Sequence, residues 1–230
     1  MAVPKDKRWR ALRGVCSLFL ALSWLALSPT PALAACSGDE VHDAVGGNEK
    51  DVAAATRIGD RADVLVNDFA SNQHRVWRAV GLIKDPNNFL EAGWVLRVDI
   101  FGNQSKHPYK TWRDLGVTRE EIIGNVTFAA GTTHEFKVHD QNGDQQWSFA
   151  YDGNAMGNEP MAMTQGLPVT ESERRCTTNS LKADFTHLNK INCVNCSWTA
   201  YDDLQKYINT TTDWKFCRRS ATRYEVLKTC

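Results

Sequence analysis

The sequence lacks the features that mark several large protein classes. No apolar run reaches the roughly 18 residues typical of a membrane-spanning helix, and the chain has neither an internal repeat nor a low-complexity segment. Lys+Arg and Asp+Glu number 27 each, so the formal net charge is zero, which gives no reason to expect nucleic-acid binding. The Gly-x-Ser-x-Gly, His-Glu-x-x-His and phosphate-loop motifs are also missing. These absences leave the class of activity open.

Apolar and aromatic residues are abundant by contrast. Of the 230 residues, 42% are hydrophobic, 10% are aromatic and 23% are charged. This composition supports a packed core and excludes a disordered tail, a collagen-like repeat and a coiled coil. At about 150 residues per domain, the length predicts one domain.

Residues 1–34 have the pattern of a secretory signal peptide. Five basic residues lie within residues 1–13, an apolar stretch runs from 15 to 27, and Ala32-Leu33-Ala34 offers a small-residue cleavage site. Its removal leaves 22 basic against 26 acidic residues, a net charge of −4. The sequence therefore predicts a secreted, extracellular protein whose mildly acidic surface does not favour nucleic acid or anionic membranes.

The same cleavage region has a second interpretation. Leu33-Ala34-Ala35-Cys36 resembles a bacterial lipobox, in which Cys36 would be acylated and hold the protein on a membrane. We favour release, because the cleavage region begins at Pro29 rather than directly against the apolar stretch. Release also leaves an even number of cysteines for pairing.

The cysteines of the released chain are disulfide candidates, because an exported protein meets an oxidising compartment. They are Cys36, Cys176, Cys193, Cys196, Cys217 and Cys230. Neither a second Cys-x-x-Cys nor a suitably spaced His completes a zinc site around Cys193 and Cys196. Six cysteines allow 15 connectivities, among which we expect Cys176 with Cys217, because each adjoins a strand-like segment.

The chain after the leader divides into two parts. Residues 35–60 are small and polar without a sustained period, and we interpret them as a loose lead-in. Residues 61–230 show short strand-like runs separated by turn residues, with a cysteine-rich end. Two short helices are expected at 118–123, after a Thr-x-x-Glu capping box, and at 201–208.

A first hairpin is predicted from residues 75–83 and 89–101 around a Pro/Asn turn. Side chains alternate between the faces of a strand, and a turn centred on Pro86 pairs Leu82 with Leu90 on an apolar face. On the mixed face, Gly81 opposes Glu91 and Trp77 opposes Val95. Arg78 falls on the apolar face beside Trp94, and we place it at a rim, stacked on that ring.

A second hairpin is predicted from residues 134–139 and 147–151, joined by an Asn-Gly turn. Further strand-like segments lie at 160–163, 181–185 and 223–228. Many short strands between turns predict an all-β protein built as an antiparallel β-sandwich or jelly roll.

Two segments carry a resemblance to known folds. The run from Thr133 to Gly153, with its Trp-x-Phe and Asp-Gly, resembles the concanavalin A-like lectin/glucanase and laminin-G-type jelly rolls. The run Asn88-Phe-Leu-Glu-Ala-Gly-Trp94 resembles a central strand of uncharacterised secreted actinobacterial proteins with that architecture. The resemblance covers about residues 60–190 and implies the sandwich fold, which hosts lectins, hydrolases, lyases and adhesion modules.

The mixed face of the first hairpin is the candidate ligand site, with Trp77, Glu91, Gly93 and Arg97 as its residues. Sugars pack their C–H faces on aromatic rings and use their hydroxyls on charged partners. We therefore expect a non-catalytic carbohydrate-binding protein. The alternatives are a glycan-cleaving enzyme, for which Glu91 needs a second carboxylate that the sequence does not identify, and a structural or protein-interaction module.

A calcium ion is a further candidate, at Asp140, Asn142 and Asp144. These residues place oxygen ligands at alternate positions, although the distant bidentate Glu of an EF-hand is missing. A polar hairpin turn is the simpler interpretation of the same residues. No other cofactor is indicated.

Overall fold

The computed structural model describes residues 40–50, 56–69, 75–176, 179–208 and 212–230. The predicted leader, the lipobox and Cys36 lie outside these residues. Within them the chain forms strands and turns, without a helix and therefore without a helix that could cross a membrane. The strands are β1 (Glu40–Glu49), β2 (Gly59–Leu65), β3 (Val76–Asp85), β4 (Asn88–Val98), β5 (Gln104–Asp114), β6 (Val117–Ile122), β7 (Thr133–His139), β8 (Gln146–Tyr151), β9 (Asn154–Pro160), β10 (Leu167–Cys176), β11 (Ala183–Ile191), β12 (Thr199–Ala200), β13 (Leu204–Ile208), β14 (Lys215–Ser220) and β15 (Arg223–Leu227).

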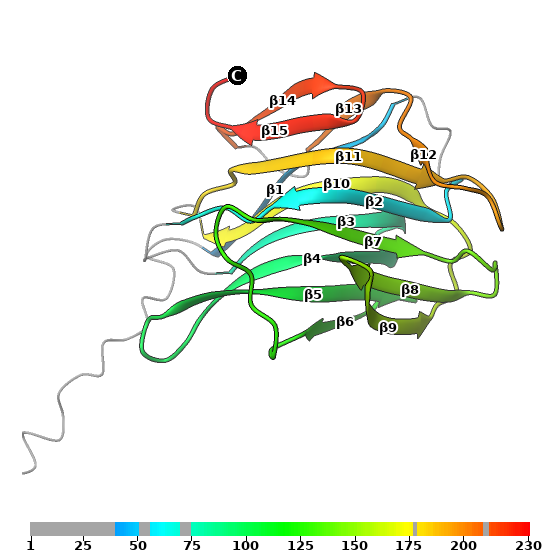
Figure 1. Cartoon of the computed structure of the whole chain (residues 1–230), viewed down its shortest axis with the longest axis horizontal. Coiled ribbons are helices and arrows are strands. Elements are labelled where there is room, and N and C mark those ends of the chain that lie inside the picture. Colours follow the sequence, from blue (N-terminus) through cyan, green and yellow to red (C-terminus); the bar gives the residue numbers. More distant parts are fainter. Residues whose placement is uncertain (1–39, 51–55, 70–74, 177–178, 209–211) are drawn as a thin grey trace, which may run out of the picture. The chain divides into compact units, whose positions relative to one another are not determined.

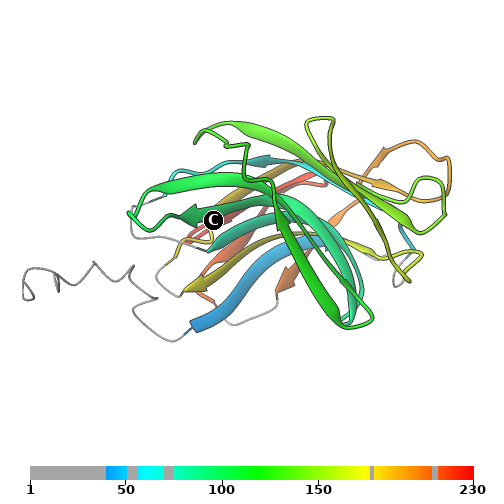
Figure 2. The ribbon, with the colours of Figure 1, turned by 90° about the horizontal axis from the view of Figure 1, so that it is seen from below.

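Two antiparallel sheets form a sandwich, which confirms the predicted fold class (Figure 1). One sheet has the order β13-β1-β10-β3-β4-β5-β6, and the other has the order β14-β15-β11-β2-β7-β8-β9. The short β12 pairs with β11. The long strands of both sheets are twisted and curved (Figure 2), as right-handed strand twist requires.

The first predicted hairpin is confirmed with its register. β3 and β4 pair Leu82 with Leu90, Gly81 with Glu91 and Trp77 with Val95. The backbone N–H of Asn87 donates to the Asp85 carboxylate at 2.8 Å and closes the turn. The register therefore gives the seven-stranded sheet one apolar face and one mixed face, as the alternation predicts.

The apolar faces of the two sheets meet in the main core. Its fully buried aromatic residues come from both sheets, and they are Trp94, Phe136, Trp147, Phe149, Phe185 and Tyr224. Stacked rings of Phe185 and Tyr224, with centroids 4.9 Å apart, lie in this core. Each buried ring contributes roughly 1.5–3 kcal/mol of apolar burial, so this layer dominates the stability of the sandwich.

Arg78 lies in this core rather than at a rim, which corrects its expected position. Its side chain is fully buried, with the guanidinium carbon 5.5 Å from the Trp94 ring centroid. The guanidinium donates hydrogen bonds to the backbone carbonyls of Lys182, Ser180, Trp77 and Glu173 at 2.6–3.3 Å. A buried cation is tolerated here because carbonyl oxygens take the place of water. Burial lowers the pKa of Arg78 to about 9, so it stays charged at neutral pH.

The expected loose lead-in is wrong, because part of it forms an inner strand. β1 lies between β10 and β13, and its residues 43–49 are buried. Gly46 permits the close approach to β10, since a Cβ there would lie 2.4 Å from the Thr170 oxygen. A strand that is buried on both faces has no polar-apolar alternation, which explains why the sequence shows no period there.

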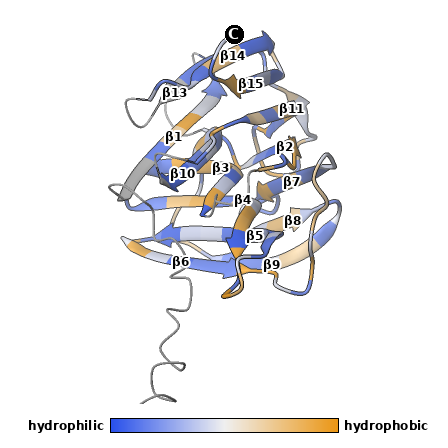
Figure 3. Ribbon diagram, turned by 90° about the vertical axis from the view of Figure 1, so that its left-hand side faces the viewer, coloured by the Kyte–Doolittle hydropathy of each residue, from blue (hydrophilic) through white to orange (hydrophobic). Residues whose placement is uncertain are grey.

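Both expected helices are also wrong. Residues 117–122 form β6, which pairs with β5, and residues 204–208 form β13, which pairs with β1. The capping-box signal is local, and sheet pairing overrides it. β6 is an edge strand with an exposed, charged surface (Figure 3), a composition that protects an open edge. The strand expected at 160–163 does not form, because β9 ends at Pro160 and residues 161–163 are not in a strand.

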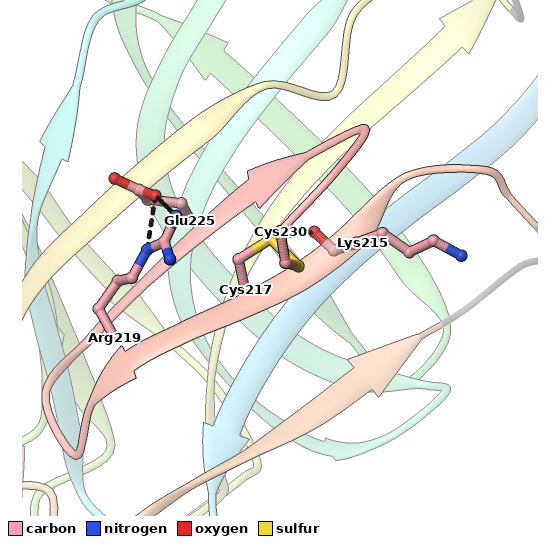
Figure 4. The surroundings of a disulfide bond; sticks show 5 residues. All are labelled: Lys215, Cys217, Arg219, Glu225 and Cys230. Carbon is pink, nitrogen blue, oxygen red and sulfur yellow. Dashed lines mark hydrogen bonds and ion pairs between the residues drawn. A yellow bond between two sulfur atoms is a disulfide. The ribbon is translucent and has the colours of Figure 1, made fainter.

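Two disulfides join described cysteines, Cys193 with Cys196 and Cys217 with Cys230. The expected pairing of Cys176 with Cys217 is therefore wrong. Cys217 lies on β14 and bonds the C-terminal residue, 13 positions away, at the end of the β14–β15 hairpin (Figure 4). β15 returns antiparallel to β14, and Cys230, which follows β15, is thereby brought beside Cys217. The spacing of the cysteines in the sequence does not indicate this proximity. Such bonds are typical of an oxidising compartment, and secretion itself stays a prediction.

Candidate functional site

The outer face of the seven-stranded sheet, which points away from the second sheet, carries a cluster of glutamates. Glu91 on β4 pairs across the sheet with Gly81 on β3, and Glu171 on β10 pairs with Ala79 on β3. Glu173 follows two residues after Glu171 and therefore lies on the same face. We call Glu91, Glu171 and Glu173 the glutamate cluster.

Small residues on β3 and β4 form the floor that lets these carboxyls meet. A Cβ at Gly93 would lie 1.9 Å from the Arg78 carbonyl oxygen, and one at Gly81 would lie 2.6 Å from Cγ of Glu91. No larger residue fits at either position without moving a strand. Because Gly81 and Ala79 carry almost no side chain, Glu91 reaches across β3 to form a side-chain hydrogen bond with Glu171. Glu171 in turn forms a side-chain hydrogen bond with Glu173.

Burial gives these carboxyls unusual acidities. Glu91 is 8% exposed and Glu171 is 5% exposed. Desolvation, reinforced by the charge of Glu173, raises the pKa of Glu91 to about 7. Burial together with the neighbouring carboxyls holds the pKa of Glu171 and of Glu173 well above the usual range. The glutamate cluster therefore keeps protons at a pH where exposed glutamates have lost them.

A small apolar cluster borders the glutamates. It consists of Ala79, Val95 and Tyr109 with the partly buried Trp77 and Ile122. Burial and the nearby charges of all three glutamates raise the pKa of Tyr109 well above its ordinary value, so its hydroxyl keeps its proton. The guanidinium carbon of Arg175 lies 5.8 Å from the Trp77 ring centroid.

The predicted ligand residues lie together on this outer face. Trp77, Glu91 and Gly93 are neighbours there; Trp77 is partly buried and Glu91 is 8% exposed. Arg97 is exposed, six residues beyond Glu91 on the same strand. Their role in binding stays a prediction. Glu171 and Glu173 were not predicted from the sequence. Their only sequence signal is a pair of glutamates at alternate positions of β10, a segment that was not predicted to be a strand.

The predicted calcium loop is a closed polar turn. The Asp140 carboxylate accepts hydrogen bonds from the backbone N–H groups of Gly143, Asp144 and Gln145 at 2.9–3.2 Å. Asp140 is buried, whereas Asn142 and Asp144 are exposed. Across the described residues, no group of three or more His, Cys, Asp or Glu is placed to hold a metal ion. Both carboxylate oxygens of Asp140 thus already accept hydrogen bonds from backbone N–H groups. Calcium binding at this turn stays a prediction.

Comparisons with known proteins show a shared fold. No protein-family model matches the chain, and the search of curated proteins found no match. A solved structure of scytalido-glutamic peptidase with a transition-state analogue inhibitor is similar over 82% of this chain and 98% of its own, with a TM-score of 0.56 at 13% identity. A second structure of that peptidase gives a TM-score of 0.51 at 14% identity, over 81% of this chain and 97% of its own. A homodimeric agglutinin from chicken liver covers 57% of this chain and 92% of its own, with a TM-score of 0.38 at 10% identity.

These likenesses show the sandwich fold alone. The concanavalin A-like assignment is supported as far as the β-sandwich architecture, a fold that hosts many unrelated functions.

Proposed function

We propose that the protein is a hydrolase that cleaves peptide bonds with Glu91 and Glu171. The observation that carries this proposal is the direct hydrogen bond between two buried carboxyls on an outer sheet face. Two adjacent carboxyls share a proton, because both cannot ionise at so short a distance. One is then a base and the other an acid at the same pH.

The roles follow from the opposite effects of this contact on the pKa values of the two carboxyls. The bond to Glu171 favours the ionised form of Glu91 and the protonated form of Glu171. The Glu91 carboxylate accepts a proton from a water molecule as the water oxygen bonds to the carbonyl carbon. When the carbon–nitrogen bond breaks, Glu171 gives its proton to the departing amine. Transfer of a proton from Glu91 to Glu171 along their hydrogen bond restores the starting state.

The spacing of the carboxyls favours peptide hydrolysis over glycan cleavage. Glycosidases hold their two carboxyl groups about 5–9.5 Å apart, with room for a sugar or a water between them. Hydrogen-bonded carboxyls are closer than this, at roughly 3 Å. Aspartic proteases hold their two carboxyls at about that separation. The fold shared with a glutamic peptidase adds support, although that likeness speaks for the fold alone.

Carbohydrate binding at the same face is the second candidate. The partly buried Trp77 beside the low floor of Ala79 and Gly93 favours it, because a sugar ring packs on an exposed indole face. Arg175 occupies part of the space over that ring, so a sugar would have to displace it or use the remaining edge. Binding without turnover, abolished by Trp77→Ala, distinguishes this candidate.

The test is peptide hydrolysis by the purified protein and three variants. A mixture of quenched fluorescent peptides serves as substrate, and released amino groups are measured from pH 3 to pH 9. Glu91→Gln and Glu171→Gln should each lower kcat by at least about 100-fold, the ordinary contribution of a positioned acid or base. Glu135→Gln on β7, which removes a partly exposed ion pair with Arg61, is the matched control and should change little.

Absence of hydrolysis at every pH would overturn the proposal. Equal activity of Glu91→Gln and the unchanged protein would overturn the assigned roles. Circular dichroism of each variant shows whether a loss of activity reflects a loss of fold.

A further inference from the structure

The outer face changes its charge along the strands. Two residues beyond Glu173, β10 presents Arg175, whose position over Trp77 places it on the outer face. Two residues beyond Val95, β4 presents Arg97 at the next outward position, and its side chain is exposed. The acidic centre of this face is therefore followed by basic residues toward one end of the sheet.

A third arginine lies between these two. The backbone N–H of Arg75 donates to the Leu96 carbonyl, and the Arg75 carbonyl accepts from the N–H of Arg175, both at 3.3 Å. Arg75 thus lies directly before β3, between β4 and β10, in a left-handed backbone conformation with φ of 55°, and its side chain is exposed. We call Arg75, Arg97 and Arg175 the arginine row. It spans three adjacent strands.

We propose that the arginine row binds a carboxylate of the peptide substrate, four to six residues from the bond that is cleaved. This inference rests on the proposed peptide hydrolysis. Four residues of strand separate Glu171 from Arg175, and six separate Glu91 from Arg97, or about 13 Å and 20 Å at roughly 3.3 Å per residue. An extended substrate has the same rise, so an acidic residue four to six positions away reaches the arginine row while its peptide bond lies over the glutamates.

The chemistry of the two charge groups fits this direction. Guanidinium groups bind carboxylates through paired hydrogen bonds. Arg97 is exposed, so little desolvation opposes the contact of its guanidinium with a carboxylate. The glutamate cluster disfavours an acidic side chain beside the cleaved bond, and the arginine row attracts one farther along. Negative charge at the centre of the face and positive charge toward one end therefore set both the position and the direction of the substrate.

The test uses matched peptides with one fixed cleavable core and blocked ends. One peptide carries Glu five residues before the cleaved bond, a second carries it five residues after, and each has a partner with Gln in that place. Glu on one of the two sides should lower KM by about three- to tenfold relative to Gln, with kcat within about twofold. The gain should shrink at high salt because exposed charges are screened.

Variants assign the gain to the arginine row. Arg97→Ala and Arg75→Ala should remove the difference in KM between the Glu and Gln peptides. The control is Arg119 on β6, which is exposed and pairs with the inward-facing Trp112 on β5. Arg119→Ala should retain the difference between the Glu and Gln peptides. A further peptide with a free C-terminal carboxylate in place of Glu shows whether a terminal carboxylate is bound as well as a side chain. A gain from either source supports the arginine row.

The outcomes separate this inference from the proposed function. Cleavage of all peptides with no preference for Glu, or a preference that survives in Arg97→Ala, overturns the arginine row and leaves the hydrolase intact. If no peptide is cleaved, fluorescence anisotropy of labelled Glu and Gln peptides measures binding directly. Equal binding of the two peptides then overturns the inference as well.

Discussion

Replacing Glu91 by Gln should stabilise the protein at alkaline pH and leave its stability in acid nearly unchanged. Glutamine has the shape of a protonated glutamate and can still hydrogen-bond with Glu171. In the unfolded chain Glu91 ionises near its ordinary pKa of 4.5, whereas in the folded protein it keeps its proton up to about pH 7. Between these pH values the folded state binds more protons than the unfolded state, so stability falls as the pH rises.

The magnitude follows from the two pKa values. The interval between the ordinary pKa of 4.5 and the folded pKa of about 7 corresponds to about 3 kcal/mol, at 1.36 kcal/mol per pH unit. This is the destabilisation that an ionised Glu91 causes above pH 7. The loss begins near pH 4.5 and is complete once the pH exceeds the folded pKa. Glu91→Gln cannot ionise and should therefore gain up to about 3 kcal/mol over the unchanged protein at pH 8.5, and almost nothing at pH 4.

Urea unfolding followed by tryptophan fluorescence measures this difference. Both proteins are unfolded at pH 4, 5.5, 7 and 8.5, and the free energies are compared at each pH, so that effects common to both chains cancel. Glu135→Gln serves as the control and should differ from the unchanged protein by less than about 1 kcal/mol throughout. A difference between Glu91→Gln and the unchanged protein that is the same at every pH, or that favours the unchanged protein at pH 8.5, would refute the reasoning.

Three further substitutions test the surrounding structure. Gly93→Ala should lower the free energy of unfolding by about 3 kcal/mol or prevent folding, because the added Cβ would lie 1.9 Å from a backbone oxygen; an unchanged urea midpoint would contradict the close strand pairing. Arg78→Met should cost about 3 kcal/mol, because it leaves buried carbonyls without donors; a thermal midpoint within 2 °C of the original, roughly 0.5 kcal/mol for this size, would contradict that account. Replacing both Cys217 and Cys230 by Ser should lower the free energy of unfolding by about 3 kcal/mol, because the disulfide closes a loop with a sequence separation of 13. An unchanged denaturant midpoint would contradict this and show that the disulfide adds nothing to global stability.

Much of the sandwich is predictable from the sequence where polar and apolar residues alternate. In β4 the even-numbered positions from Leu90 to Val98 are all apolar, and the pairing of β4 with β3 places Leu82 opposite Leu90 as the pattern predicts. β1 is not predictable in this way, because both of its faces are buried by neighbours distant in sequence. β6 and β13 depend on the same non-local pairing, which outweighs a local helix signal.

The candidate site is likewise only partly predictable from the sequence. The sequence places Trp77 and Glu91 on one face, because one hairpin carries both. It does not supply the partner carboxyl, because Glu171 belongs to a strand 80 positions later that lies beside β3 only in the folded sheet. Arg78 is misplaced for a related reason. Two of its four acceptors, the carbonyls of Ser180 and Lys182, come from the segment that follows β10, and no spacing rule links them to β3.

The energetics of the glutamate cluster favour a functional role over a structural one. Three neighbouring carboxyls removed from water destabilise the folded state whenever they ionise, and an apolar residue at Glu171 would bury its side chain without that cost. The fold nevertheless places the small residues Gly81 and Ala79 on β3 between Glu91 and Glu171. The side chains that hydrogen-bond with Glu171 are both carboxyls, whereas the charges of Arg175 and Arg78 act on Glu173 at the other end of the cluster. Perturbed acidities produced by such like-charge contacts are found where a proton is to be moved. Under the proposed function, burial of these carboxyls on the outer face of β3, β4 and β10 lowers stability in exchange for a pair of groups that can move a proton.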